Sequence, residues 1–173
     1  KALGDDGLLR AIMRLLEDEG FCMVGVHEVV GDVLAPAGTW GRHAPDEQAW
    51  RDIERGFAVA RRLGEADVGQ AVVVQQGIVL GVEAVEGTDA LLARCAELRR
   101  PGSGGVLVKV KKPTQDERAD LPTIGTHTVE GARAAGLRGI AVEAGQTIVV
   151  DEQAVTAAAD RTGLFVHGIQ SEP

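Results

Sequence analysis

Residues 111–125 hold the densest group of reactive side chains in the chain: three cations, three carboxylates, an amide and two hydroxyls, spaced by two prolines and a glycine. Carboxylates can hold a hard cation such as Mg²⁺, and cations can neutralise substrate phosphates. This mixture suits phosphoryl transfer better than acyl transfer, because the charge that develops in phosphoryl transfer spreads over phosphate oxygens. A solvated surface turn explains the same residues equally well, so their chemistry alone leaves both interpretations open.

Three further clusters of polar side chains stand where an expected element ends or begins. They are His27 with Glu28, Glu83 with residues 86–89, and Thr123 with residues 125–128. A histidine beside a glutamate is more often a structural pair than a catalytic one, and Thr88-Asp89 is a common helix start. For the third cluster, a phosphate-binding helix start and a routine cap are equally supported. His43 and His167 have no partner that the sequence identifies, and Glu143, at an expected strand end, is a further candidate.

Composition narrows the classes of function. The 173 residues are 45% hydrophobic and 25% charged, which suits one soluble globular domain with a sizeable core. Aromatic residues make up only 3% and the net charge is -8, so neither base stacking nor a basic face for nucleic acid is expected. No apolar run has the length of a membrane span and no signal peptide is recognisable, which indicates a cytoplasmic protein. Cys22 and Cys95 are therefore expected to be buried free thiols.

Recognised catalytic motifs do not assign a reaction. The sequence contains no GxSxG, Walker A, HExxH or GxGxxG pattern. The common nucleophile, P-loop, zincin and Rossmann sites therefore have no motif in this chain.

Hydrophobic periodicity predicts the elements that position these groups. Helices are expected over residues 5–19, 45–63, 88–99, 126–135 and 151–160, with Thr88 and Asp151 as the N-caps of the third and the last. Strands are expected over residues 21–26, 70–74, 78–84, 106–110, 140–143, 147–150 and 164–167, and a loop over 31–44. This alternation predicts an α/β fold: a layered mixed sheet with flanking helices, in a single domain. The tight turn at residues 75–77 predicts an antiparallel hairpin within it.

Part of the charged segment resembles the signature of a known enzyme family. Lys112-Pro113, Gln115, Arg118 and the string Asp120-Leu121-Pro122-Thr123-Ile124-Gly125 are similar to the motif of the UDP-2,3-diacylglucosamine pyrophosphatases of lipid A biosynthesis, in the type found in alpha-proteobacteria and some other Gram-negative bacteria. The likeness continues along nearly the whole chain, through His27-Glu28-Val29, Asp67-Val68-Gly69-Gln70 and Glu86-Gly87-Thr88-Asp89 to Gly163-Leu164-Phe165-Val166. The resemblance therefore favours a site over a surface turn at residues 111–125.

The resemblance implies an activity and roles for individual residues. Enzymes of this family use Mg²⁺, direct water at the phosphorus bonded to uridine, and hydrolyse UDP-2,3-diacylglucosamine to UMP and 2,3-diacylglucosamine 1-phosphate (lipid X). By this resemblance Asp120 is catalytic and, with Glu86, binds the metal. Gln115 and Arg118 are the other expected catalytic residues. The expected substrate-binding residues are Lys112, Thr88, Asp89, Thr123 and His27.

The resemblance also bears on domain organisation and partners. Family members carry an N-terminal domain of about 100 residues, an ordinary domain size, and the lipid product lies between the two domains. Residues 1–173 are therefore expected to be the C-terminal catalytic domain, which could be inactive alone. A cytoplasmic homodimer with a peripheral contact at the inner membrane is expected, with a lipid-linked nucleotide-sugar as substrate and no nucleic-acid partner. Two alternatives remain: a non-catalytic nucleotide-sugar or phosphate-binding module, and a structural or dimerisation domain.

Overall fold

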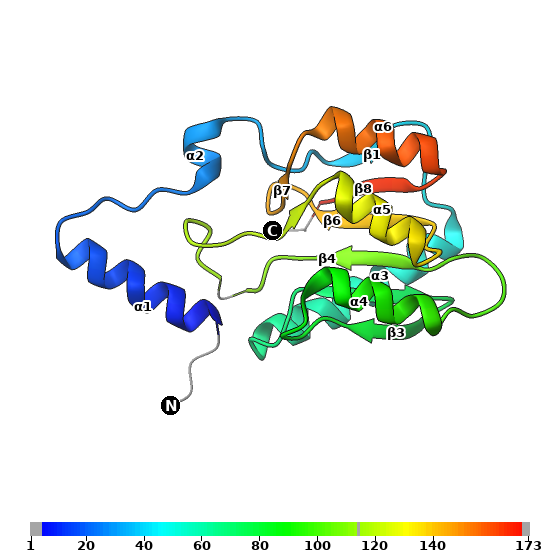
Figure 1. Ribbon diagram of the computed structural model, residues 1–173, viewed down its shortest axis with the longest axis horizontal. Helices are drawn as coiled ribbons and strands as arrows, with labels where there is room; N and C mark the ends of the chain where they lie inside the picture. The colour runs from blue at the N-terminus through cyan, green and yellow to red at the C-terminus, as the bar shows by residue number, and fades with distance from the viewer. Residues whose placement is uncertain (1–4, 114, 171–173) are drawn as a thin grey trace.

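The computed structural model, which describes residues 5–113 and 115–170, is built around one six-stranded mixed sheet (Figure 1). The strands lie in the order β1-β8-β6-β4-β2-β3. Their bounds are β1 Gly38–Trp40, β2 Ala71–Gln75, β3 Ile78–Val82, β4 Val106–Lys109, β6 Gly139–Glu143 and β8 Phe165–Ile169. Strands β4, β6 and β8 are parallel, whereas β2 runs antiparallel to β3 and β4, and β1 runs antiparallel to β8. The predicted α/β fold with a mixed sheet is confirmed, as is the hairpin.

Helices cover both faces of the sheet, as predicted. Helix α3 (Glu47–Glu65) packs on one face, and α4 (Gly87–Glu97), α5 (Thr126–Ala134) and α6 (Glu152–Thr162) cover the other (Figure 1). Two apolar cores follow from this arrangement, because alternate residues of a strand point to opposite faces of its sheet. Val72, Val74 and Val108 belong to the core under α3. Val73, Leu107 and Ile140 belong to the core under the other three helices.

Two glycines explain how closely α3 approaches the sheet. A Cβ added at Gly56 would stand 2.5 Å from Val108 Cγ2, so a larger residue there would push the helix away from β4. Near the end of α3, a Cβ added at Gly64 would stand 3.0 Å from Lys112 Cα. Close packing of α3 therefore fixes the point at which the charged segment leaves the sheet.

A second, two-stranded sheet holds the string at residues 120–125. Strand β5 (Thr123–Ile124) pairs in parallel with β7 (Ile148–Val149). The backbone N–H of Ile148 also donates to the carbonyl oxygen of Pro122 at 2.7 Å. This pairing orders a stretch that its prolines and charges would otherwise leave irregular.

The strand expected at residues 21–26 is wrong. Helix α1 (Asp5–Asp18) forms as predicted, but residues 21–25 have no regular structure and α2 (Val26–Val30) follows them. Among the described residues, no strand pairs with this stretch to complete a ladder, and Phe21 and Val24 are exposed. Cys22 is exposed for the same reason, so the expectation of buried thiols is confirmed only for Cys95.

Two further predictions need correction. The loop expected at residues 31–44 contains β1, because Thr39 and Trp40 pair with residues of β8 that lie more than a hundred positions later in the chain. The N-cap of α4 is Glu86 and not Thr88, because Gly87 adopts a φ of 78° and the helix begins at that residue. None of the helices within residues 5–113 and 115–170 has both the length and the apolar character that a membrane crossing requires.

Candidate active site

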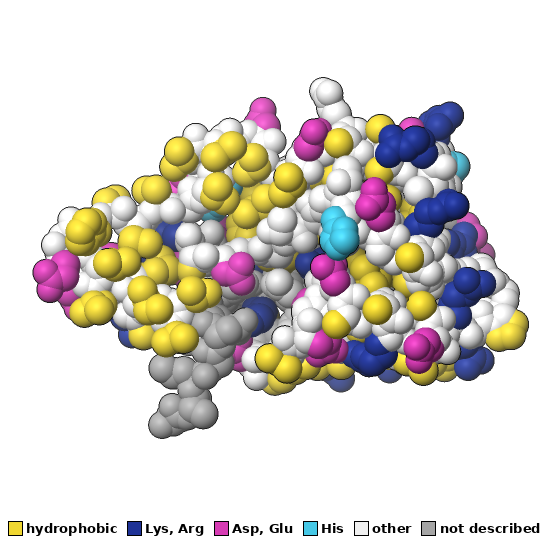
Figure 2. Space-filling view, viewed as in Figure 1, with side chains coloured by type: hydrophobic (Ala, Val, Ile, Leu, Met, Phe, Trp, Pro, Cys, Tyr) yellow, Lys and Arg dark blue, Asp and Glu magenta, His cyan; other side chains and the backbone are white. Residues whose placement is uncertain are grey.

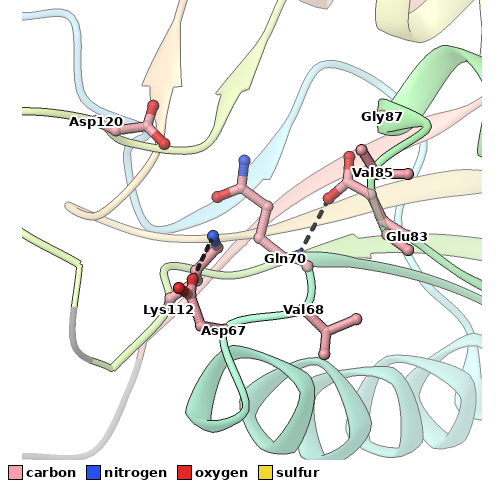
Figure 3. A pocket seen from close by; sticks show the side chains of 10 residues that line it. Asp67, Val68, Gln70, Glu83, Val85, Gly87, Lys112 and Asp120 are labelled. Carbon is pink, nitrogen blue, oxygen red and sulfur yellow. Dashed lines mark hydrogen bonds and ion pairs between the residues drawn. The ribbon is translucent and has the colours of Figure 1, made fainter. Parts of the chain in front are cut away.

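A cavity of about 400 Å³, here named the Asp120 cavity, opens at the edge of the sheet where β4 ends (Figure 3). Three chain segments meet there: the α3–β2 connection, the β3–α4 connection and the segment after β4. They meet because β2 runs antiparallel to both β3 and β4, so the start of β2 lies beside the ends of these two strands. The lining residues are Asp67, Val68, Gly69, Gln70, Glu83, Ala84, Val85, Gly87, Lys112 and Asp120. The fold thus collects three carboxylates, an amide and an amine from segments that are distant in sequence.

Two polar side chains of the charged segment are buried, which excludes a solvated position for them. Lys112 and Gln115 are only 4% and 5% exposed. The side-chain carbonyl oxygen of Gln115 accepts from the backbone N–H of Lys112 at 3.1 Å, and its amide nitrogen donates to Asp120 Oδ2 at 2.6 Å. Gln115 therefore ties Asp120 to the end of β4. The structure brings together these three residues, all of which the sequence analysis singled out.

Lys112 presents its amine at the wall of the Asp120 cavity. The amine donates to Asp67 Oδ1 at 2.9 Å, a bond drawn as a dashed line in Figure 3. Asp67 has a φ of 53°, in the left-handed region that residues other than glycine rarely adopt and that is enriched at functional sites. This strained turn keeps the Asp67 carboxylate against Lys112. The pair gives the cavity a fixed cation with a negative partner.

Glu83 is the third carboxylate of the cavity, and its two oxygens have different donors. Oε2 accepts from the backbone N–H of Gln70 at 3.1 Å, and Oε1 accepts from the hydroxyl of Thr88 at 2.7 Å. The side-chain oxygen of Gln70 is buried and has no hydrogen-bond partner in the part of the chain that the structure describes. A buried acceptor without a donor costs about 1–3 kcal/mol. A cation or a hydrogen-bond donor from a ligand would remove that cost.

Lys109 is a central residue that sequence analysis missed. It is 5% exposed, and its amine donates to Thr88 Oγ1 at 3.0 Å and to the carbonyl oxygen of Thr123 at 2.9 Å. Burial lowers the pKa of Lys109, while the carboxylates of Glu83 and Asp120 oppose that shift. The available signal was a lysine inside an otherwise apolar strand, where an unpaired charge is unfavourable.

Several predicted residues surround a second cavity, of about 330 Å³, here named the Thr88 cavity. It is lined by Glu86, Gly87, Thr88, Asp89, Lys109, Thr123, His127 and Thr128. Gly87 lines both cavities, so the two are neighbours. Glu86 forms a 2.6 Å ion pair with Arg94, and hydrogen bonds from its own backbone N–H and from Arg94 lower the pKa of Glu86. The structure therefore places Glu86 beside the Thr88 cavity, apart from Asp120.

Arg118 lies on the outer side of the charged segment. Its guanidinium pairs with Asp116 at 2.8 Å and with Glu17 of α1 at 2.7 Å. The hydrogen bond from Arg118 lowers the pKa of Asp116 to about 2. Arg118 therefore connects the segment to α1 and does not line the Asp120 cavity.

His27 is also separate from the other predicted residues. It lines a different cavity, of about 570 Å³, together with Asp32 and Glu152. Its Nδ1 is buried without a hydrogen-bond partner among the described residues. His27 does not line the Asp120 cavity or the Thr88 cavity.

The Asp120 cavity offers oxygen atoms of the kind that Mg²⁺ prefers. Asp120, Glu83, Asp67 and Gln70 line it (Figure 3). Among the described residues, no three or more His, Cys, Asp or Glu side chains gather closely enough to hold a metal ion unaided. Such an arrangement still fits Mg²⁺, which usually takes one or two carboxylates and completes its shell with water and substrate phosphates.

Comparisons with known proteins identify the family of the chain. The family model of the LpxI C-terminal domain matches residues 36–167, a range that contains every residue lining the Asp120 cavity. The chain is 48% identical over 175 residues to the UDP-2,3-diacylglucosamine pyrophosphatase LpxI of Caulobacter vibrioides. That similarity covers 98% of this chain and 62% of the relative, so the chain spans less than two thirds of the relative's length. By the family-model match and the 48% identity over most of its length, the chain belongs to the LpxI C-terminal domain family.

Proposed function

We propose that residues 1–173 form the C-terminal catalytic domain of a Mg²⁺-dependent hydrolase that cleaves the pyrophosphate of UDP-2,3-diacylglucosamine. The products are UMP and 2,3-diacylglucosamine 1-phosphate. One observation carries the proposal: Asp120 is held by buried Gln115 at the mouth of a cavity that also contains a lysine amine and two further carboxylates. The name of the Caulobacter relative supplies the substrate.

The residues of the Asp120 cavity have distinct roles in this proposal. Asp120, Glu83 and the side-chain oxygen of Gln70 would hold Mg²⁺, which supplies Lewis-acid polarisation of the phosphate and a more acidic bound water. Gln115 keeps Asp120 in one orientation through its 2.6 Å hydrogen bond. Lys112 neutralises phosphate charge from a position that Asp67 fixes.

The Thr88 cavity is the proposed position of the substrate's nucleotide or sugar part. Thr88, Asp89 and Thr123 line it and offer hydroxyl and carboxylate groups to a polar ligand. Glu86, expected as a second metal ligand, would have to exchange its Arg94 partner for the cation. His27 and Arg118 remain predictions as substrate-binding and catalytic residues, since both stand outside these two cavities.

The surface over α1 and α2 is the proposed place for the acyl chains. Figure 2 shows hydrophobic side chains gathered on this part of the molecule. The most exposed of them are Leu8, Leu15, Phe21, Val29 and Val30. A peripheral contact with the inner membrane is part of the same proposal, because the substrate is itself a membrane lipid. The proposal also includes a cytoplasmic location and homodimer formation.

The test is hydrolysis of UDP-2,3-diacylglucosamine by the full-length protein and its Asp120→Ala variant, followed as release of UMP. The variant is expected to lose at least about 100-fold in kcat, the size of effect seen when one polar group that stabilises a transition state is removed. Glu117→Gln is the matched control, because Glu117 is an exposed carboxylate of the same segment. Full activity of Asp120→Ala would refute the assignment.

A non-catalytic binding module is the second candidate. It is favoured by the carboxylate arrangement, because among the described residues no three or more His, Cys, Asp or Glu side chains gather closely enough to hold a metal ion. Binding of UMP by the full-length protein, with no turnover of the diacyl substrate, would select this alternative.

A further inference from the structure

Lys109 joins the two chain segments that carry Glu83 and Asp120. Its amine donates to Thr88 Oγ1 at 3.0 Å and to the carbonyl oxygen of Thr123 at 2.9 Å. Thr88 lies in the first turn of α4, the helix that follows Glu83 in the chain. Thr123 belongs to the string that begins with Asp120. One buried ammonium group therefore links two walls of the Asp120 cavity.

The direction of these hydrogen bonds follows from the chemistry of the groups. An ammonium group only donates, so the hydroxyl of Thr88 accepts from Lys109 and must give its own proton to another acceptor. That acceptor is Glu83 Oε1, at 2.7 Å. Glu83 Oε2 accepts from the backbone N–H of Gln70 at 3.1 Å. Both oxygens are thus held by donors, and each keeps a lone pair for a further ligand.

We propose that Lys109 and Thr88 are positioning residues that set the orientation of the Glu83 carboxylate, and its spacing from Asp120, for a divalent cation in the Asp120 cavity. The inference rests on the proposed function, because it takes the cation to bind there. Lys109 acts through Thr88 and the Thr123 backbone and does not touch the cation. Residues that orient metal-binding side chains often affect metal affinity and activity nearly as strongly as the ligands themselves.

The position of Lys109 in the strand supports this role. The other residues of β4 are apolar and fully buried, so an apolar side chain would suit the site. A buried ammonium is unfavourable unless it is paired and hydrogen-bonded, and here the negative charges of Glu83, Asp120 and Asp89 favour the charged form of Lys109. Two carboxylates that share one cavity repel each other, and a cation between their segments offsets that repulsion. The lysine is thus explained by the carboxylates that it organises.

The experiment compares Lys109→Met, Thr88→Val, Thr88→Ser and the double variant K109M/T88V in the full-length protein. Methionine keeps the length of the lysine side chain without its charge, valine keeps the shape of threonine without its hydroxyl, and serine keeps the hydroxyl. Mn²⁺ affinity is measured without substrate by electron paramagnetic resonance, and kcat and KM are measured with the diacyl substrate. Thr162→Val is the matched control, because the Thr162 hydroxyl donates to Ala158 and Ala159 within α6, in neither cavity.

Lys109→Met is expected to weaken Mn²⁺ binding about 10- to 100-fold and to lower kcat by a similar factor, with a much smaller change in KM. Thr88→Val is expected to act in the same direction, and Thr88→Ser, which keeps the hydroxyl, is expected to bind Mn²⁺ more tightly than Thr88→Val. Thr162→Val is expected to stay close to the wild type. The double variant should lose no more than K109M alone, since both substitutions break one hydrogen-bonded chain. If K109M does not fold, the contrast between T88V and T88S decides.

Wild-type Mn²⁺ affinity in K109M, accompanied only by a lower melting temperature, would overturn the inference. Additive losses in the double variant, or a wild type that binds no Mn²⁺, would overturn it as well. If the wild type binds Mn²⁺ and K109M binds it more weakly, but the wild type never hydrolyses the diacyl substrate, the positioning role is supported. That result would refute only the proposed function.

Discussion

The side-chain amide of Gln115 donates a 2.6 Å hydrogen bond to Asp120 Oδ2, while its carbonyl oxygen accepts from the backbone N–H of Lys112. Because Gln115 is 5% exposed, water competes little for either bond. Gln115 therefore links the orientation of Asp120 to the backbone at Lys112, just after β4, through a buried side chain.

Replacing Gln115 by Ala is expected to lower kcat about 10- to 100-fold with little change in KM, because Asp120 loses the donor that orients it. Gln115→Glu should be at least as damaging, since it places a second carboxylate against Asp120. Steady-state kinetics with the diacyl substrate measure both effects. Gln48→Ala is the matched control, as Gln48 donates to Asp52 in a similar glutamine–aspartate bond on α3. Equal losses in Q48A and Q115A would contradict a specific role for Gln115.

Removing divalent cations with EDTA is expected to stop turnover and to lower the melting temperature, and Mg²⁺ should restore both. A ligand at 100 times its Kd stabilises the folded state by about 2.7 kcal/mol, which a thermal melt can resolve. Glu83→Gln should reduce the rise in melting temperature that Mg²⁺ causes, because Glu83 lines the Asp120 cavity. Glu97→Gln, at an exposed position of α4, serves as its control. The same rise in E83Q as in the wild type would exclude Glu83 from the cation site.

The Arg118–Asp116 pair is expected to make stability depend on acid pH. The hydrogen bond from Arg118 lowers the pKa of Asp116 from 3.8 to about 2, so the folded state favours the ionised carboxylate. Its stabilising contribution is therefore present above the unfolded value of 3.8 and is lost as the pH falls through about 2. Urea denaturation of the wild type and Arg118→Gln should give a difference in the free energy of unfolding that disappears in this pH range. A difference independent of pH would argue against the ion pair as its cause.

Asp52 is expected to be a residue of stability and not of activity. It is 1% exposed and accepts from the backbone N–H groups of Gly77 at 2.6 Å and Gln76 at 3.0 Å, in the β2–β3 turn. Asp52→Ala should lower the free energy of unfolding by about 2–3 kcal/mol, since it leaves these donors unpaired. Turnover per folded molecule should be unchanged, because this turn lies at the end of the hairpin opposite Glu83. Glu54→Gln, exposed on α3, is the control in urea denaturation.

Local patterns in the sequence determined most of the elements. The helices, the hairpin and the Val-rich strands form close to their predicted ranges, because periods of 3.6 and 2 residues already specify which face of an element is apolar. Asp151 caps α6 as predicted, since a cap needs only neighbouring residues. The string that begins with Asp120 was also recognisable, because its residues are contiguous in the sequence.

The tertiary structure alone decided which polar side chains meet. Asp67, Gln70 and Glu83 share a cavity with Asp120 only because β2 lies between β3 and β4 in the sheet. Lys109 donates to Thr88 and Thr123, and no local pattern encodes these two contacts. The strand expected at residues 21–26 does not form, because no strand among the described residues pairs with this stretch. Sequence periodicity tells which side of an element is buried, whereas the partner on that side depends on sheet order and helix packing.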